Sequence, residues 1–168
     1  MVFPAHLLEQ AHHLATREKT RPRQASLRRA VSTAYYAIFH LLIHEATLNW
    51  KRVEQRDFLA RMFEHGKMKN ASERQRGLCD RYLNATPPPS PGQQLDCMRE
   101  MRQVTKAFIE SQQFRHAADY DNSMQWTRTD VLKLIASVTA AFKSWQAIRE
   151  HDDAQAFLIS LLGNPRSA

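Results

Sequence analysis

Hydrophobic residues recur along most of this chain at spacings of three and four, which is the period of an α-helix. The clearest stripe lies between residues 131 and 148 and comprises Val131, Leu134, Ile135, Val138, Phe142, Trp145 and Ile148. Thr127 and Asp130 precede this stripe with the spacing of a capping box, in which a hydroxyl and a carboxylate satisfy the free N–H groups of a first turn. We therefore predict an amphipathic helix that begins just after Thr127.

The same period predicts further helices before and after this one. We expect them at residues 7–15 after Pro4, at about 23–50, 53–64, 71–84 and 95–118, and at 154–162. Gly66 is expected to end the short charged segment, and Leu78 and Tyr82 are expected to point inward from the next helix. The proline-rich stretch 86–92 cannot be helical, because prolines remove N–H donors and favour extended backbone, so it is predicted to be a stiff turn. The pattern predicts an all-α fold, an up-and-down bundle of four to five main helices plus short ones, in a single domain over residues 1–168.

Composition agrees with a helical chain that folds without metal or disulfides. The 168 residues include 21 Ala but only 6 Val, 6 Ile and 4 Gly, and Ala is the residue that loses least on entering a helix. Cys79 and Cys97 have neither a metal-ligand spacing nor a disulfide framework, and no apolar stretch is long enough to cross a bilayer. We expect a reduced, cytoplasmic protein with no secretory signal, no membrane segment, no metal and no cofactor.

The net charge of +7 is carried by the first half of the chain. Residues 1–84 hold 15 Lys and Arg against 8 Asp and Glu, whereas residues 85–168 hold 9 of each. Arg outnumbers Lys by 17 to 7, and the planar guanidinium can bind a phosphate through two hydrogen bonds. This bias favours a polyanionic partner such as RNA, with a solvated basic surface as the alternative.

The predicted helix at 23–50 carries an unusual polar face. Five of its residues share that face, at spacings of three, four and seven: Arg29, Thr33, Tyr36, His40 and His44. Near residue 119 the chain offers a partner, because Arg115 and Asp119 lie four residues apart on one predicted helix face. We expect Asp119 to pair with Arg28 or Arg29, with Arg29 preferred, and Tyr36 or Tyr120 to add a hydrogen bond. Such a junction either stabilises the bundle or presents Arg and His to a phosphate.

These segments resemble a known family. Residues 28–40, read as RRAVSTAYYAIFH, are similar to the SRxYYAxFH helix of HEPN-domain proteins, and residues 115–120, RHAADY, are similar to the RxxADY end of a later helix in that family. Residues 63–67 resemble, more weakly, the segment between the two. Together the similarities extend over about residues 23–150.

The resemblance implies a helical bundle, usually dimeric, that acts on RNA in toxin–antitoxin or defence systems, in some cases beside a nucleotidyltransferase. Many members are metal-independent ribonucleases with an Arg-x4-6-His motif, but none of the eight histidines here has Arg five, six or seven residues before it. We therefore expect a protein that binds RNA, a nucleotide or a partner protein without that motif. A ribonuclease with a rearranged Arg/His site and a purely structural partner subunit are the alternatives.

The candidate site residues follow from these motifs. The catalytic candidates for a rearranged site are Arg29, His40, Arg115 and His116. The binding candidates are Arg28, Arg29, Tyr36, His40, His65, Lys67, Arg115, Asp119 and Tyr120.

Overall fold

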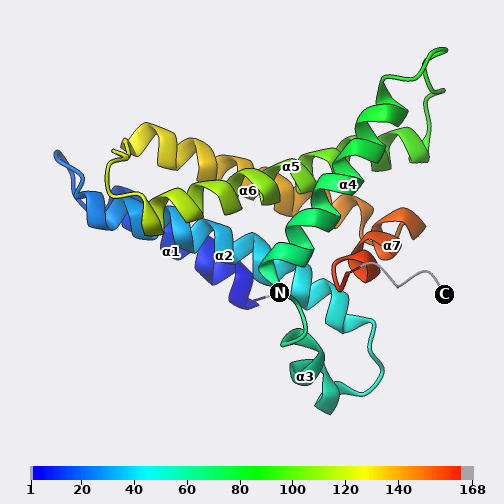
Figure 1. Cartoon of the computed structure of the whole chain (residues 1–168), viewed down its shortest axis with the longest axis horizontal. Coiled ribbons are helices and arrows are strands. Elements are labelled where there is room, and N and C mark those ends of the chain that lie inside the picture. Colours follow the sequence, from blue (N-terminus) through cyan, green and yellow to red (C-terminus); the bar gives the residue numbers. More distant parts are fainter. Residues whose placement is uncertain (1, 164–168) are drawn as a thin grey trace. The chain divides into compact units, whose positions relative to one another are not determined.

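The prediction of an all-α fold is confirmed. The structure is a computed structural model of the chain and describes residues 2–163. Within that range it contains seven α-helices, one 3₁₀ turn and no strand (Figure 1). The helices are α1 (Val2–Thr16), α2 (Gln24–Leu48), α3 (Arg56–Ala60), α4 (His65–Leu83), α5 (Gln93–Tyr120), α6 (Arg128–Ile148) and α7 (Asp152–Ser160), and the 3₁₀ turn is η1 (Val53–Gln55).

Five of the seven helices are long, as predicted, but two boundaries were wrong. Residues 53–64 form η1 and the short α3 rather than one helix, and α4 begins at His65 and runs through Gly66, which was expected to end the preceding segment. On α4, Cys79 is buried and Tyr82 half-buried, whereas Leu78 is exposed, contrary to the prediction. A glycine within a helix costs only about 1 kcal/mol relative to alanine, so Gly66 need not end the helix.

The described chain divides into two compact units. Unit 1 comprises residues 1–41 and 107–142, and unit 2 comprises residues 42–106 and 143–168. The prediction of one HEPN-like domain over residues 1–168 stays a prediction.

Unit 1 is a bundle of α1 with parts of α2, α5 and α6, whose chain direction alternates from one helix to the next (Figure 1). Small residues line α2 at Ala30, Ala34 and Ala37, all fully buried, so neighbouring helices can approach closely. Tyr35, also fully buried, packs against Phe108 with ring centroids 5.8 Å apart. Burial raises the pKa of Tyr35 well above its ordinary value, so this phenol stays protonated.

Two arginines hold the helix C-termini of unit 1. Arg28 donates to the carbonyls of Ala118, Asp121 and Met124 at 2.7–2.9 Å, and α5 ends at Tyr120. Arg128 donates in the same way to the carbonyls that follow α1, including that of Lys19 at 3.1 Å. The last carbonyls of a helix have no partner within the helix and carry partial negative charge, so a guanidinium there is stabilising.

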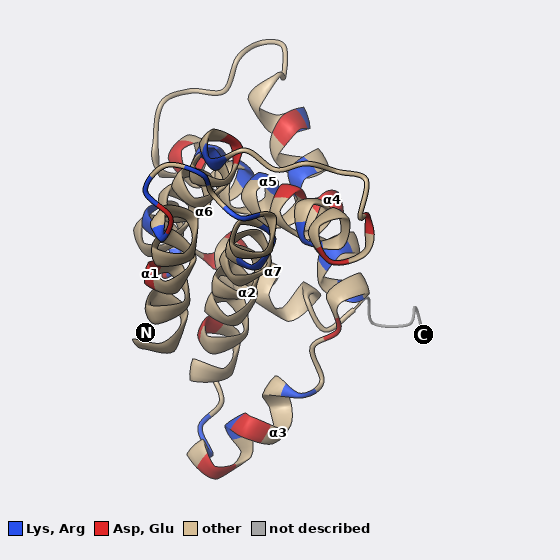
Figure 2. Ribbon diagram, turned by 90° about the vertical axis from the view of Figure 1, so that its left-hand side faces the viewer, with Lys and Arg blue, Asp and Glu red and all other residues tan. Residues whose placement is uncertain are grey.

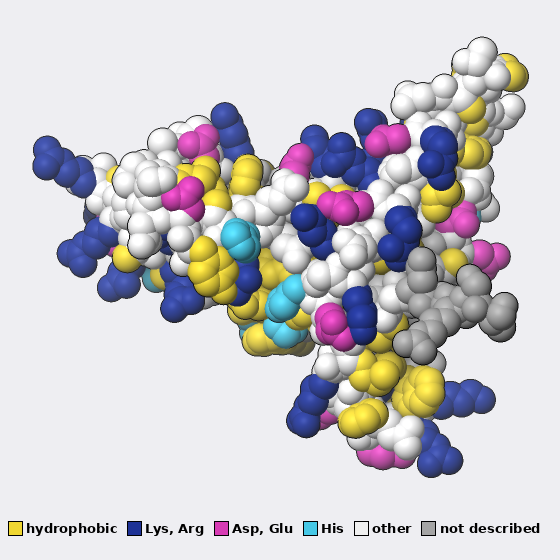
Figure 3. Space-filling model, in the orientation of Figure 1, with side chains coloured by type: hydrophobic (Ala, Val, Ile, Leu, Met, Phe, Trp, Pro, Cys, Tyr) yellow, Lys and Arg dark blue, Asp and Glu magenta, His cyan; other side chains and the backbone are white. Residues whose placement is uncertain are grey.

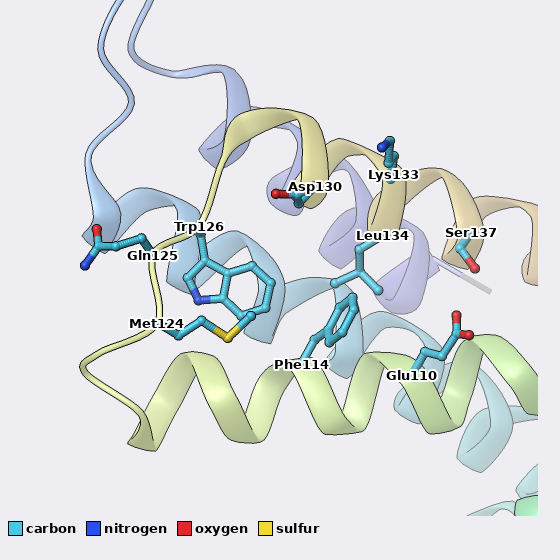
Figure 4. Close-up of a pocket in the computed structure, with 9 residues that line it drawn as sticks. All are labelled: Glu110, Phe114, Met124, Gln125, Trp126, Asp130, Lys133, Leu134 and Ser137. Carbon is cyan, nitrogen blue, oxygen red and sulfur yellow. The ribbon is translucent and has the colours of Figure 1, made fainter.

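The Thr127 half of the predicted capping box before α6 is confirmed. The Thr127 hydroxyl oxygen accepts from the Asp130 amide at 3.2 Å and donates to the Asp130 carboxylate. The segment that leads into it rests on α5, where Phe114 and the buried Trp126 meet edge to face at 5.5 Å beside Met124 and Leu134 (Figure 4).

Unit 2 contains α3, α4 and α7 with the remaining parts of α2, α5 and α6. Its core includes Trp145 and Phe157, whose ring centroids lie 6.5 Å apart. A buried ion pair joins Arg149 to Glu45 at 3.0 Å, and only 3% of the Glu45 side chain is exposed. No described helix is long and apolar enough to cross a membrane.

Candidate functional site

The motif residues of unit 1 form a cluster around Arg115. The Arg115 Nε lies 2.7 Å from an Asp119 carboxylate oxygen, and Ser32 donates to the other oxygen at 2.6 Å. Arg115 also donates to the Tyr36 hydroxyl at 3.3 Å. Its guanidinium lies 5.8 Å from the ring centroid of Tyr36 and 5.7 Å from that of Tyr120, within cation–π range.

This arrangement overturns the predicted pairing of Arg29 with Asp119. The i, i+4 pair of Arg115 and Asp119 on α5 was predicted and is confirmed, but the second partner of Asp119 is Ser32, which is 2% exposed on α2. Arg28 turns to the end of α5, and the Arg29 side chain is exposed. A short hydroxyl reaches Asp119 from the buried face of α2, whereas Arg29 lies on a more exposed part of the helix.

The cluster favours the charged form of Arg115. Partial burial works against the guanidinium charge, yet the Tyr36 and Tyr120 side chains and the Asp119 carboxylate outweigh it and raise the pKa of Arg115 above its ordinary value. Only 21% of the Arg115 side chain and 27% of the Asp119 side chain are exposed. Because its charge is matched by Asp119 and one of its N–H groups donates to Tyr36, Arg115 acts as a structural anchor.

The two candidate histidines of unit 1 have different surroundings. His40 is half-buried and packs against aromatic rings, with centroid distances of 5.1 Å to Phe3 and 6.2 Å to Tyr36. His116 is exposed and lies 5.1 Å from the ring of Tyr120, which is itself 66% exposed. His116 and Tyr120 are thus open to solvent, whereas His40 is half-buried between the rings of Phe3 and Tyr36.

The remaining candidates, His65 and Lys67, begin α4 and belong to unit 2. His65 is half-buried, and Lys67 forms an exposed ion pair with Glu64. An exposed pair of this kind contributes little to stability.

Sequence reasoning missed a basic cleft in unit 2. This basic cleft has a volume of about 280 Å³ and lies between α4 and α5. Its lining residues are Arg76 and Leu83 of α4 and Arg99, Arg102, Gln103 and Lys106 of α5. The spacing of the three cations on α5 indicates one helix face, but only the fold brings Arg76 of α4 to the same cleft. Figure 2 shows Lys and Arg positions on both α4 and α5.

One carboxylate organises the basic cleft. Asp80 lies 2.6 Å from Arg102 and 3.7 Å from Arg76, and so holds guanidinium groups from two helices. Arg99 is more open, with 63% of its side chain exposed and a long 3.9 Å approach to Asp96. Figure 3 shows Lys and Arg side chains gathered over α4 and the adjacent part of α5. The lining holds Arg76, Arg99, Arg102 and Lys106, and Asp80 pairs with two of them, so the concave surface carries more positive than negative charge, which favours phosphate groups.

Comparison with known proteins identifies no relative of this chain: no family model, no curated protein and no solved structure matches it.

Proposed function

We propose that this protein is a HEPN-like helical module that binds RNA through the basic cleft and does not cleave it. The toxin–antitoxin or defence context and the choice of RNA over DNA come from the sequence resemblance, and the cytoplasmic location from the cysteine content and the expected lack of a signal or membrane segment. The basic cleft is the observation that carries the proposal.

The cleft suits a phosphate chain better than a single nucleotide. The described side chains that line it offer four cations, one amide and one leucine, and no aromatic ring on which a base could stack. Most of the affinity of a protein for single-stranded RNA at such a surface comes from phosphate contacts. An RNA backbone that runs along the cleft can place successive phosphates near Arg76, Arg99 and Arg102. The contacts then all contribute to the affinity for one strand.

The Arg115 cluster supports binding without cleavage. A ribonuclease of this kind needs an Arg to stabilise the phosphate and a His to move a proton. Arg115 is held by Asp119 and Tyr36, Arg28 is held by the end of α5, and His40 packs among rings. Of the four catalytic candidates, Arg115 and His40 thus contact neighbouring side chains, whereas Arg29 and His116 are exposed.

One observation favours a second function, a ribonuclease with a rearranged site. Arg115 and the exposed His116 both approach the ring of Tyr120, at 5.7 and 5.1 Å. If this group acts on RNA, wild-type protein cuts RNA in the presence of a chelator and His116→Ala does not. RNA that stays intact after long incubation with the wild type would exclude the ribonuclease and leave RNA binding as the function.

The partner in this proposal is a second copy of the chain, as the resemblance implies. In unit 2 an apolar surface around α3 exposes Trp50, Phe58 and Met62 by 48%, 72% and 50%. Charges of both signs flank it, at Asp57 and Arg61, so one such surface can complement another related by a twofold axis. A nucleotidyltransferase is the partner to test if the protein is monomeric.

A binding experiment with paired variants tests the RNA function. The dissociation constant of a labelled single-stranded RNA is measured by fluorescence anisotropy for the wild type and for Arg99→Gln with Arg102→Gln. We expect affinity to fall by about tenfold for each lost contact, since hydrogen bonds to charged groups contribute about 1.5–3 kcal/mol.

The matched control removes the same charge elsewhere on the same helix pair. Arg74 and Arg81 are exposed on α4 and do not line the basic cleft, so Arg74→Gln with Arg81→Gln should bind nearly as well as the wild type. A further variant, Arg29→Gln, tests the motif surface of unit 1. Loss of binding in Arg29→Gln but not in the cleft variant would move the RNA site to unit 1.

A further inference from the structure

Cys97, His151 and Asp153 meet in unit 2, although they are far apart in the sequence. Cys97 lies in the second turn of α5, while His151 and Asp153 lie at the start of α7. One potential ligand atom from each residue lies within 4.8 Å of the others. Spacing along the chain predicts no metal site at Cys97, because its two neighbours here come from the start of another helix.

His151 is held at the start of α7 by a capping hydrogen bond. Its Nδ1 accepts from the Asp153 amide at 3.2 Å, which fixes the imidazole beside Asp153. The same Nδ1 lies 3.8 Å from the Asp153 carboxylate. A metal bound at Nδ1 would replace this long hydrogen bond. The Asp153 N–H group, which lies in the first turn of α7, can then bond to water instead.

The Asp153 carboxylate is held in position by a neighbour. Gln94 donates to one of its oxygens at 2.7 Å. Hydrogen bonds of this kind orient the ligands of metal sites, and their loss typically weakens metal binding by about 10–100-fold. Gln94 therefore acts as a positioning residue for Asp153.

Two of the three residues, Cys97 and His151, border a solvent-open cleft with acidic walls. This acidic cleft has a volume of about 460 Å³ and is lined by Cys97 and His151 together with three carboxylates, Asp96, Glu100 and Glu150. Cys97 is 2% exposed at its edge. The acidic cleft gives a cation a path from solvent and leaves room for water beside the three side chains.

We propose that Cys97, His151 and Asp153 form a Zn²⁺ site whose fourth position opens into the acidic cleft. Thiolate sulfur, imidazole nitrogen and carboxylate oxygen are the ligands that zinc prefers, and three protein ligands plus water complete a tetrahedron. On binding, the Cys97 thiol gives its proton to solvent and its sulfur bonds to the metal. The site links α5 to α7 within unit 2 and is independent of the RNA function.

Metal titration of the purified, chelator-treated protein tests this site. We expect one Zn²⁺ per chain by calorimetry, and Co²⁺ as a probe should give a sulfur-to-cobalt charge-transfer band in the near ultraviolet. Cys97→Ser should remove that band and weaken zinc binding by at least tenfold. Gln94→Ala should weaken it about 10–100-fold with the band retained.

Two further variants keep the result interpretable. His151→Asn removes the imidazole but retains a residue that caps helices well, so the variant should fold and lose the metal. Asp152→Asn, next to Asp153 on α7, and His13→Asn, on the exposed face of α1, are the matched controls and should bind zinc normally. Absence of stoichiometric zinc, or equal affinity in the wild type and Cys97→Ser, would overturn the proposal.

Discussion

The Asp119 carboxylate joins two helices of unit 1 by pairing with Arg115 at 2.7 Å on its own helix, α5, while it accepts a hydrogen bond from Ser32 on α2. Both oxygens are used, and the groups that use them are largely buried. The two segments that resemble HEPN motifs are therefore joined to each other through Asp119.

Asp119→Ala should destabilise the protein by about 2 kcal/mol, because it leaves the Arg115 charge and the Ser32 hydroxyl without their partner. The melting temperature should fall by about 4–8 °C for a chain of this size. Asp152→Ala, at an exposed position, is the control and should change it little. The double variant Arg115→Met with Asp119→Leu should recover much of the loss. Unchanged stability in Asp119→Ala together with lost RNA binding would instead make the junction a ligand site.

Arg28 and Arg29 should differ sharply despite being adjacent. Arg28→Ala removes three hydrogen bonds to carbonyls around the end of α5 and should cost about 1.5–3 kcal/mol in urea unfolding. Arg29→Ala should stay within about 0.5 kcal/mol, because its side chain is exposed. Equal effects of the two substitutions would contradict the assignment of Arg28 as the group that holds this helix end.

Stability should fall in alkaline solution because of Cys79. Burial raises the pKa of this thiol from 9.0 to about 11. Below pH 9 the folded and unfolded states both keep the proton, so the thiol does not favour either. Between pH 9 and pH 11 the unfolded state loses the proton while the folded state retains it, so the free energy of unfolding decreases as pH rises.

Urea unfolding of metal-free protein at several pH values measures this effect. Cys79→Ala should show a smaller decrease between pH 9 and pH 11 than the wild type does. A parallel decrease in both proteins would assign the alkaline sensitivity to other groups, such as the buried Tyr35, whose pKa burial also raises.

The apolar surface around α3 predicts self-association. Phe58→Asp places a charge at a side chain that is 72% exposed in the single chain, so folding should be unaffected while a dimer is weakened. Sedimentation velocity should show a dimer for the wild type and a monomer for Phe58→Asp, with Val2→Asp, at another exposed apolar position, as the control. A monomeric wild type at high protein concentration would exclude the second copy as the partner.

The sequence predicted the helices of this protein better than its polar contacts. Hydrophobic spacing placed the long helices, and the Thr127 capping box marked the start of α6, because both signals are local. The Arg115–Asp119 pair was also local, being one turn apart. The partner of Asp119 on α2 was predicted wrongly, since the choice between Arg29 and Ser32 depends on which side of that helix is buried.

The spacing of residues along the chain could not predict contacts between segments that are far apart in the sequence. The basic cleft needs Arg76 of α4 opposite Arg99 and Arg102 of α5, and the proposed zinc site needs Cys97 beside the start of α7. The net charge of the first half suggested a polyanion, but the cleft draws three of its four cations from residues after 84. The net charge of a segment does not show on which surface of the folded protein its charged side chains lie.

The salt dependence of RNA binding tests the central claim, that RNA phosphates occupy the basic cleft, most directly. For single-stranded RNA, each phosphate contact contributes about −0.7 to the slope of log affinity against log salt. Three to four contacts in the cleft predict a wild-type slope of about −2 to −3, and Arg99→Gln with Arg102→Gln should reduce its magnitude by about 1.4. Arg74→Gln with Arg81→Gln should leave the slope unchanged. A slope near zero for the wild type, or the same slope in the wild type and the cleft variant, would contradict the account.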